Sequence, residues 1–83
     1  LTSSGQKDWG IDVGTYPNRF TADKILIKTA LSEMISLEGS LRKVVKNKYG
    51  FRATFLGLSE SKAGQACKRL KNRNISCEII SPG

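Results

Sequence analysis

The chain has 83 residues, enough for one small domain with one modest core. It contains no histidine and two cysteines, which excludes imidazole-activated nucleophiles and four-ligand Cys/His zinc sites. Its 14 basic and 7 acidic side chains give a net charge of +7, which favours an anionic partner. Residues 41–83 hold ten of the basic and two of the acidic side chains, so the positive charge lies in the second half. We expect a binding domain without catalytic activity, cofactor or metal.

The first half of the chain predicts a linker end, a strand and a helix. Residues 1–8 are small and polar, so the domain is expected to begin at Trp9. From there apolar residues alternate with glycine and aspartate, which is the period of a strand with one buried face. Pro17 ends this strand, and Thr21 is expected to cap a helix that runs to about Ile35. Two apolar stripes predict a wide buried face on this helix: Ala22, Ile25, Leu26 and Thr29, and beside them Ile27, Ala30, Leu31 and Met34.

The second half predicts a hairpin, a helix and a last strand. Residues 41–48 carry valines among basic side chains, which indicates an edge strand, and residues 51–56 alternate as its hairpin partner. Ser59 is placed to cap the second helix, and residues 75–81 predict the last strand. The order βαββαβ predicts an α+β, ferredoxin-like domain, with a four-stranded antiparallel sheet of strand order 4-1-3-2 and two helices on one face.

The alternation of side chains along each strand divides the expected sheet into two faces. Those expected to face the helices are Ile11, Val13, Ala53, Phe55, Cys77 and Ile79. Those expected on the open face are Asp12, Arg52, Thr54, Glu78 and Ile80. Arg52 can bind a carboxylate through two N–H groups, and Asp12 can accept hydrogen bonds from hydroxyls; alternatively, the two residues only pair with each other. The basic side chains of the second helix are expected to be solvated surface: Lys68, Arg69, Lys71 and Arg73.

Two cysteines remain to be placed. Cys67 and Cys77 are expected to face the core between the second helix and the last strand, ten positions apart. This placement predicts a disulfide, which would stabilise a small domain and indicate an oxidising compartment. Two buried thiols packed as small apolar groups are the alternative.

Both halves of the chain carry motifs that resemble one family. The first-half motifs are Trp9-Gly10-Ile11-Asp12-Val13-Gly14-Thr15-Tyr16, the turn Asn18-Arg19 and the helix start Thr21-Ala22-Asp23. The second-half motifs are Phe51-Arg52-Ala53-Thr54-Phe55 and Gly57-Leu58-Ser59. In this order, over residues 9–81, they resemble the SPOR (sporulation-related repeat) domain, especially SPOR modules at the C-termini of penicillin-binding D-alanyl-D-alanine carboxypeptidases.

The resemblance implies a function and a site. SPOR domains bind peptidoglycan glycan strands that lack stem peptides, which recruits their parent proteins to division sites in the bacterial cell envelope. By resemblance, this chain is a single SPOR-like domain over residues 9–83 that works in the periplasm or cell envelope, and we expect it to be a monomer. Asp12 stands where the family usually has Gln, Thr15 where it has Ser, and Arg52 where it has Arg. The other expected glycan contacts are Tyr16 and Thr54, with Lys46 and Ile80 as additional ones.

The same element order also fits other binding domains. An RNA-binding domain of the RRM type stacks bases on aromatic side chains of the two central strands. Phe51 and Phe55 are instead expected to face the core, so we expect no nucleic-acid partner. A protein-interaction domain of the same fold is the other alternative. No apolar run approaches the roughly 20 residues that a membrane span needs, so we expect no membrane insertion.

Overall fold

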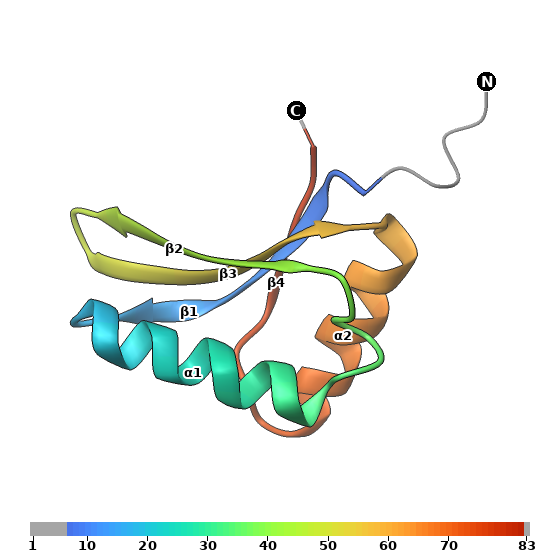
Figure 1. Cartoon of the computed structure of the whole chain (residues 1–83), viewed down its shortest axis with the longest axis horizontal. Helices are drawn as coiled ribbons and strands as arrows, with labels where there is room; N and C mark the ends of the chain where they lie inside the picture. The colour runs from blue at the N-terminus through green and yellow to red at the C-terminus, as the bar shows by residue number, and fades with distance from the viewer. Residues whose placement is uncertain (1–6, 83) are drawn as a thin grey trace.

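A computed structural model describes residues 7–82 of the chain, and it contains six elements in the predicted order. They are β1 (Trp9–Tyr16), α1 (Arg19–Ser32), β2 (Leu41–Asn47), β3 (Gly50–Leu58), α2 (Glu60–Asn72) and β4 (Glu78–Ile80). The strands form one antiparallel sheet in the order β2-β3-β1-β4, and both helices cover the same side of it (Figure 1). The α+β ferredoxin-like arrangement is therefore confirmed. In the described part of the chain, no helix is long and apolar enough to cross a membrane.

The two ends of the chain fall partly outside this description. Most of the expected linker end, residues 1–6, lies outside the described residues, as does Gly83. The first strand begins at Trp9, where the alternation of apolar residues begins.

Helix α1 begins earlier than predicted. Asn18 has an extended backbone, and its Oδ1 accepts a hydrogen bond of 2.8 Å from the Thr21 backbone N–H, which makes Asn18 the N-cap. Asparagine satisfies the free N–H groups of a first turn at least as well as threonine does. The helix therefore spans Arg19–Ser32 and stops before Ile35.

Helix α1 buries one stripe rather than the wide face predicted. Ala22, Leu26 and Thr29 are at most 3% exposed, whereas Ile27, Leu31 and Met34 are 51%, 68% and 66% exposed. A helix that lies flat on a sheet contacts it along one stripe: α1 contacts β3, β1 and β2, and α2 contacts β1, β4 and β3 on the same sheet face (Figure 1). The second stripe therefore points away from the core.

The core lies between the sheet and the two helices. Five of the predicted core-facing side chains are at most 3% exposed: Ile11, Val13, Ala53, Phe55 and Cys77. Ile79 was also expected there, but it is 50% exposed, because β4 is an edge strand of three residues and leaves Ile79 on the rim of the sheet. The observed β4 is shorter than the predicted strand 75–81, because residues 75–77 form the connection from α2 to the sheet.

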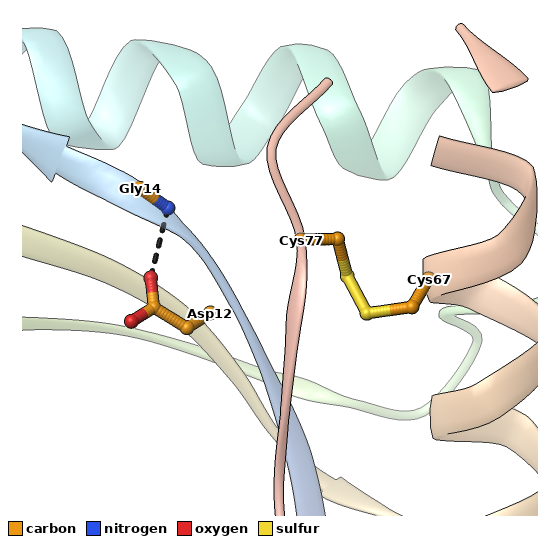
Figure 2. Close-up of a disulfide and its surroundings, with 4 residues drawn as sticks. All are labelled: Asp12, Gly14, Cys67 and Cys77. Carbon is orange, nitrogen blue, oxygen red and sulfur yellow. Dashed lines mark hydrogen bonds between the residues drawn. A yellow bond between two sulfur atoms is a disulfide. The ribbon is translucent and has the colours of Figure 1, made fainter. Parts of the chain in front are cut away.

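Helix α2 and β4 are joined by a covalent bond. Ser59 caps α2 as predicted, with its Oγ accepting a hydrogen bond of 3.1 Å from the Lys62 backbone N–H. Cys67 on α2 and Cys77 just before β4 form a disulfide, with their Cα atoms 5.3 Å apart (Figure 2). The predicted disulfide is thus confirmed, and it fastens the last strand to the second helix. Disulfides are typical of oxidising compartments outside the cytoplasm.

Candidate binding face

The side of the sheet opposite the helices is made of three rows of side chains. Residues directly opposite each other in antiparallel strands share a face, so the register defines the rows. The middle row runs across all four strands: Lys43, Thr54, Asp12 and Glu78. The rows on either side of it are Val45, Arg52 and Thr15, and Leu41, Leu56, Gly10 and Ile80. These eleven residues are called the open face below.

A bulge in β1 places Thr15 on the open face. Val13 and Gly14 together oppose Ala53 alone, and Gly14 has φ +118°, a backbone conformation that other residues rarely adopt. The Asp12 Oδ1 accepts a hydrogen bond of 2.8 Å from the Gly14 backbone N–H and so holds the bulge in shape (Figure 2). Without the extra residue, Thr15 would point to the helices.

Arg52 and Asp12 form an ion pair in the middle of the open face. Arg52 Nε lies 2.9 Å from Asp12 Oδ2, and the two side chains are 38% and 16% exposed. The Arg52 Nε–H is not aligned for a hydrogen bond, so the contact is mainly electrostatic. Within residues 7–82, the other N–H groups of the guanidinium make no hydrogen bond, so they can serve a ligand. The pairing and the binding interpretations of these residues are therefore compatible.

The open face carries balanced charge in spite of the net charge of the chain. Lys43 and Arg52 are opposed by Asp12 and Glu78, and the two carboxylates lie directly opposite each other across β1 and β4. Most of the excess positive charge lies on α2 and at the β2–β3 turn. A ligand of the open face must therefore be recognised by local hydrogen bonds and one guanidinium rather than by a broad positive field.

Thr54 is a buried residue of the open face. Its side chain is 2% exposed, and its Oγ1 donates a hydrogen bond of 2.8 Å to the Lys43 carbonyl oxygen. The hydroxyl proton is therefore already used to tie β3 to β2. Thr54 is at the expected position in the sheet, but its role there is to position its neighbours.

An apolar strip lies beside the Arg52–Asp12 pair. Ile80 was an expected contact, and the register adds Leu56 and Leu41, the latter 69% exposed. Gly10 is the remaining residue of this row. A side chain does not fit there, because a Cβ would lie 2.6 Å from the Phe55 carbonyl oxygen. Leu41 and Leu56 were not among the expected contacts, although the same alternation places them on this face once the strand register is known.

Two expected glycan contacts lie off the open face. Tyr16 pairs with Phe51 on the helix side, and its hydroxyl donates a hydrogen bond of 2.6 Å to the Val13 carbonyl oxygen. Burial, and to a lesser extent the negative charge of Asp12, raise the pKa of Tyr16. Lys46 also pairs with Phe51, and its Nζ lies 6.0 Å from the centre of that ring. The structure therefore brings together Asp12, Thr15, Arg52, Thr54 and Ile80, but neither Tyr16 nor Lys46.

Two arginines expected to be solvated surface have structural partners. Glu33 follows α1, and its side chain is 1% exposed. Arg69 Nε lies 2.6 Å from Glu33 Oε1, and Arg73 Nε lies 2.9 Å from Glu33 Oε2. These pairs join the end of α1 to α2 on the side away from the open face. Both arginines are exposed as predicted, at 54% and 50% of their side chains, but their partner was not predicted, because the burial of a carboxylate near a helix end depends on packing.

Comparison of the chain with protein-family models, with curated proteins and with solved structures gives no match. Within residues 7–82, no three His, Cys, Asp or Glu side chains gather as they would around a metal ion. A functional interpretation therefore depends on the open face and on the sequence motifs.

Proposed function

We propose that this chain is a SPOR-like module that binds peptidoglycan glycan strands lacking stem peptides, and that it does so through the open face. The observation that carries the proposal is the partly exposed Arg52–Asp12 pair in the middle of the sheet face that no helix covers. The motifs over residues 9–81 that resemble SPOR domains support the same function. The expected contacts Asp12, Thr15 and Arg52 are also neighbours in the structure.

The chemistry of the ligand suits these side chains. A glycan strand without stem peptides carries one carboxylate in each disaccharide, with many hydroxyl and acetamide groups. The free N–H groups of Arg52 can bind the carboxylate, and the exposed Thr15 hydroxyl can donate to or accept from the sugar. Asp12 can accept a hydrogen bond from a sugar hydroxyl, and the C–H faces of the rings can pack on Leu41 and Leu56.

The balanced charge of the open face also favours a glycan over a polyanion. A nucleic acid is bound largely by neutralising many phosphates, and single-stranded RNA stacks on aromatic side chains. On the open face, the described residues of β1 and β3 include no aromatic side chain. The RRM-like alternative therefore has less support than the glycan.

The disulfide supports a location for this function. We propose that the domain works in the periplasm or cell envelope of a bacterium, where disulfides form and glycan strands are accessible. There it would target a parent cell-wall protein to division sites.

The proposal is tested by co-sedimentation of the chain with purified peptidoglycan sacculi. Binding should rise after an amidase has removed the stem peptides, and it should disappear after the glycan strands have been digested. Binding that neither treatment changes would contradict the proposal. Micromolar binding to single-stranded RNA that weakens steeply with salt would replace the proposal with the RRM-like alternative.

A further inference from the structure

Helix α1 has an apolar surface that the domain itself does not cover. Its inner stripe packs on the sheet, but Phe20, Ile27 and Leu31 on the outer side are 76%, 51% and 68% exposed. These three side chains line one shallow groove, together with Asp23, Lys24 and Lys28. Figure 1 shows this helix at the edge of the molecule, on the side opposite the open face. Helix α1 therefore carries an exposed apolar strip in addition to its buried stripe, and exposed apolar patches of this kind typically mark an interaction site.

The spacing of the outer residues is that of a helix-pairing seam. Phe20, Lys24, Ile27 and Leu31 follow one another at intervals of four, three and four residues. This is the 3.5-residue period of a coiled-coil seam, with Phe20 and Ile27 at d positions and Lys24 and Leu31 at a positions. The apolar strip is narrow, because Asp23 borders it on one side and Lys28 on the other. Such a strip fits a second helix better than it fits the wide contact of a membrane surface.

The charges that border the seam match a second copy of the same chain. In this heptad register Asp23 occupies a g position and Lys28 the e position five residues later. In a parallel pair, a g residue faces the following e residue of the other helix. Asp23 of each copy would therefore face Lys28 of the other, so the symmetric dimer contains two such ion pairs.

We propose that two copies of this chain, which was expected from its sequence to be a monomer, associate through α1 as a parallel, two-fold helix pair. Lys24 then occupies an a position, where one polar residue fixes register and helix number at a cost in stability, so the association is weak and reversible. The pairing leaves both open faces uncovered, because α1 lies on the other side of the sheet. Two binding faces in one particle would raise the avidity for a long strand.

The association is measured by sedimentation equilibrium of the 83-residue chain over the micromolar to millimolar range. We expect a reversible monomer–dimer equilibrium. Ile27→Asp places a charge in the seam and should raise the dissociation constant by about a hundredfold or more. Ile79→Asp is the matched control, because Ile79 is equally exposed but lies on β4, and it should leave the constant unchanged. Lys24→Leu should lower the constant by about tenfold.

A charge exchange tests the partner and the orientation. Asp23→Lys and Lys28→Asp should each weaken association by about five- to thirtyfold, because two attractive pairs become repulsive. The double variant, and also an equimolar mixture of the two single variants, should restore it. In an antiparallel pair Asp23 would not face Lys28, so failure of this rescue beside a clear effect of Ile27→Asp would contradict the parallel arrangement.

Two further results would overturn the proposal. One is a wild-type chain that stays monomeric at millimolar concentration. The other is a monomer that sediments with vesicles of equal parts phosphatidylcholine and phosphatidylglycerol, and loses this binding in Ile27→Asp, which would make the surface a membrane contact. Circular dichroism confirms that each variant is folded, which is expected because every substituted side chain is at least partly exposed.

Discussion

Arg52 and Asp12 face each other at 2.9 Å on the one side of the sheet that no helix covers. Asp12 also holds the β1 bulge, because its other oxygen accepts the Gly14 N–H. One carboxylate thus links the backbone geometry of β1 to the position of the only guanidinium on the open face. A ligand carboxylate at Arg52 would have to share that guanidinium with Asp12.

Substitution of Asp12 separates its two roles. Asp12→Asn keeps an acceptor for the Gly14 N–H but removes the charge that pairs with Arg52. We expect the free energy of unfolding to change little and glycan affinity to stay equal or improve. Asp12→Ala also removes the hydrogen bond and should lower the free energy of unfolding by about 1 kcal/mol. Denaturant unfolding and glycan titration of both variants check this, and a large loss of affinity in Asp12→Asn would show that the carboxylate itself binds the sugar.

The fold was predictable from the sequence where alternation and capping act locally. Strand β1, the hairpin and the Ser59 cap each depend on neighbouring residues, and all three are confirmed. The outer stripe of α1 was predicted to be buried because periodicity reports that a face is apolar without reporting what covers it. Only the packing shows that the sheet contacts one stripe of α1.

The ion pairs of Glu33 are expected to be strongly coupled. Arg69→Ala leaves Arg73 beside the buried carboxylate, and Arg73→Ala leaves Arg69, so each single change should lower the free energy of unfolding by only about 1 kcal/mol. The double variant leaves the carboxylate without either arginine and should cost about 3 kcal/mol or more. Lys68→Ala, an exposed change on the same helix, is the control. Additive effects in denaturant unfolding would show that the two pairs act independently.

The disulfide is expected to matter for stability and not for binding. Cys67 and Cys77 close a short loop, so reduction should lower the free energy of unfolding by about 2 to 3 kcal/mol. Both lie behind the sheet, and glycan affinity should be retained while the reduced chain stays folded. Unfolding curves with and without reductant measure the first effect. Two free thiols in the unreduced, denatured chain would contradict the pairing.

The raised pKa of Tyr16 predicts that the domain loses stability at alkaline pH. Its pKa is raised above the usual 10.0, so the folded state resists formation of the phenolate. This contribution is fully present below the unfolded pKa and is lost as pH rises through the higher folded value. Tyr16→Phe should make the fall in unfolding free energy at alkaline pH shallower, as measured by denaturant unfolding at increasing pH. An unchanged slope in Tyr16→Phe would assign the alkaline loss to other groups.

The candidate site was predicted in outline but not in detail. Asp12 and Arg52 are at the places that strand parity predicts, whereas Thr15 was expected from the family motif alone and lies on the open face because of the bulge. The hydroxyl of Thr54 is used by the Lys43 carbonyl, and Tyr16 turns to the helix side after the bulge. Both outcomes depend on strand register and on a bulge, which alternation along one strand does not reveal.

The most direct test of the open face is the affinity of two arginine variants for a defined glycan fragment without stem peptides. Arg52→Ala should weaken binding by about 1.5 to 3 kcal/mol, the range of a hydrogen bond to a charged group. Arg42→Ala removes the same exposed charge from the adjacent strand, where Arg42 pairs with Phe55 and so points to the helix side. We expect a large loss of affinity for Arg52→Ala and almost none for Arg42→Ala. Equal losses in isothermal titration would mean that diffuse charge, and not the open face, carries the binding.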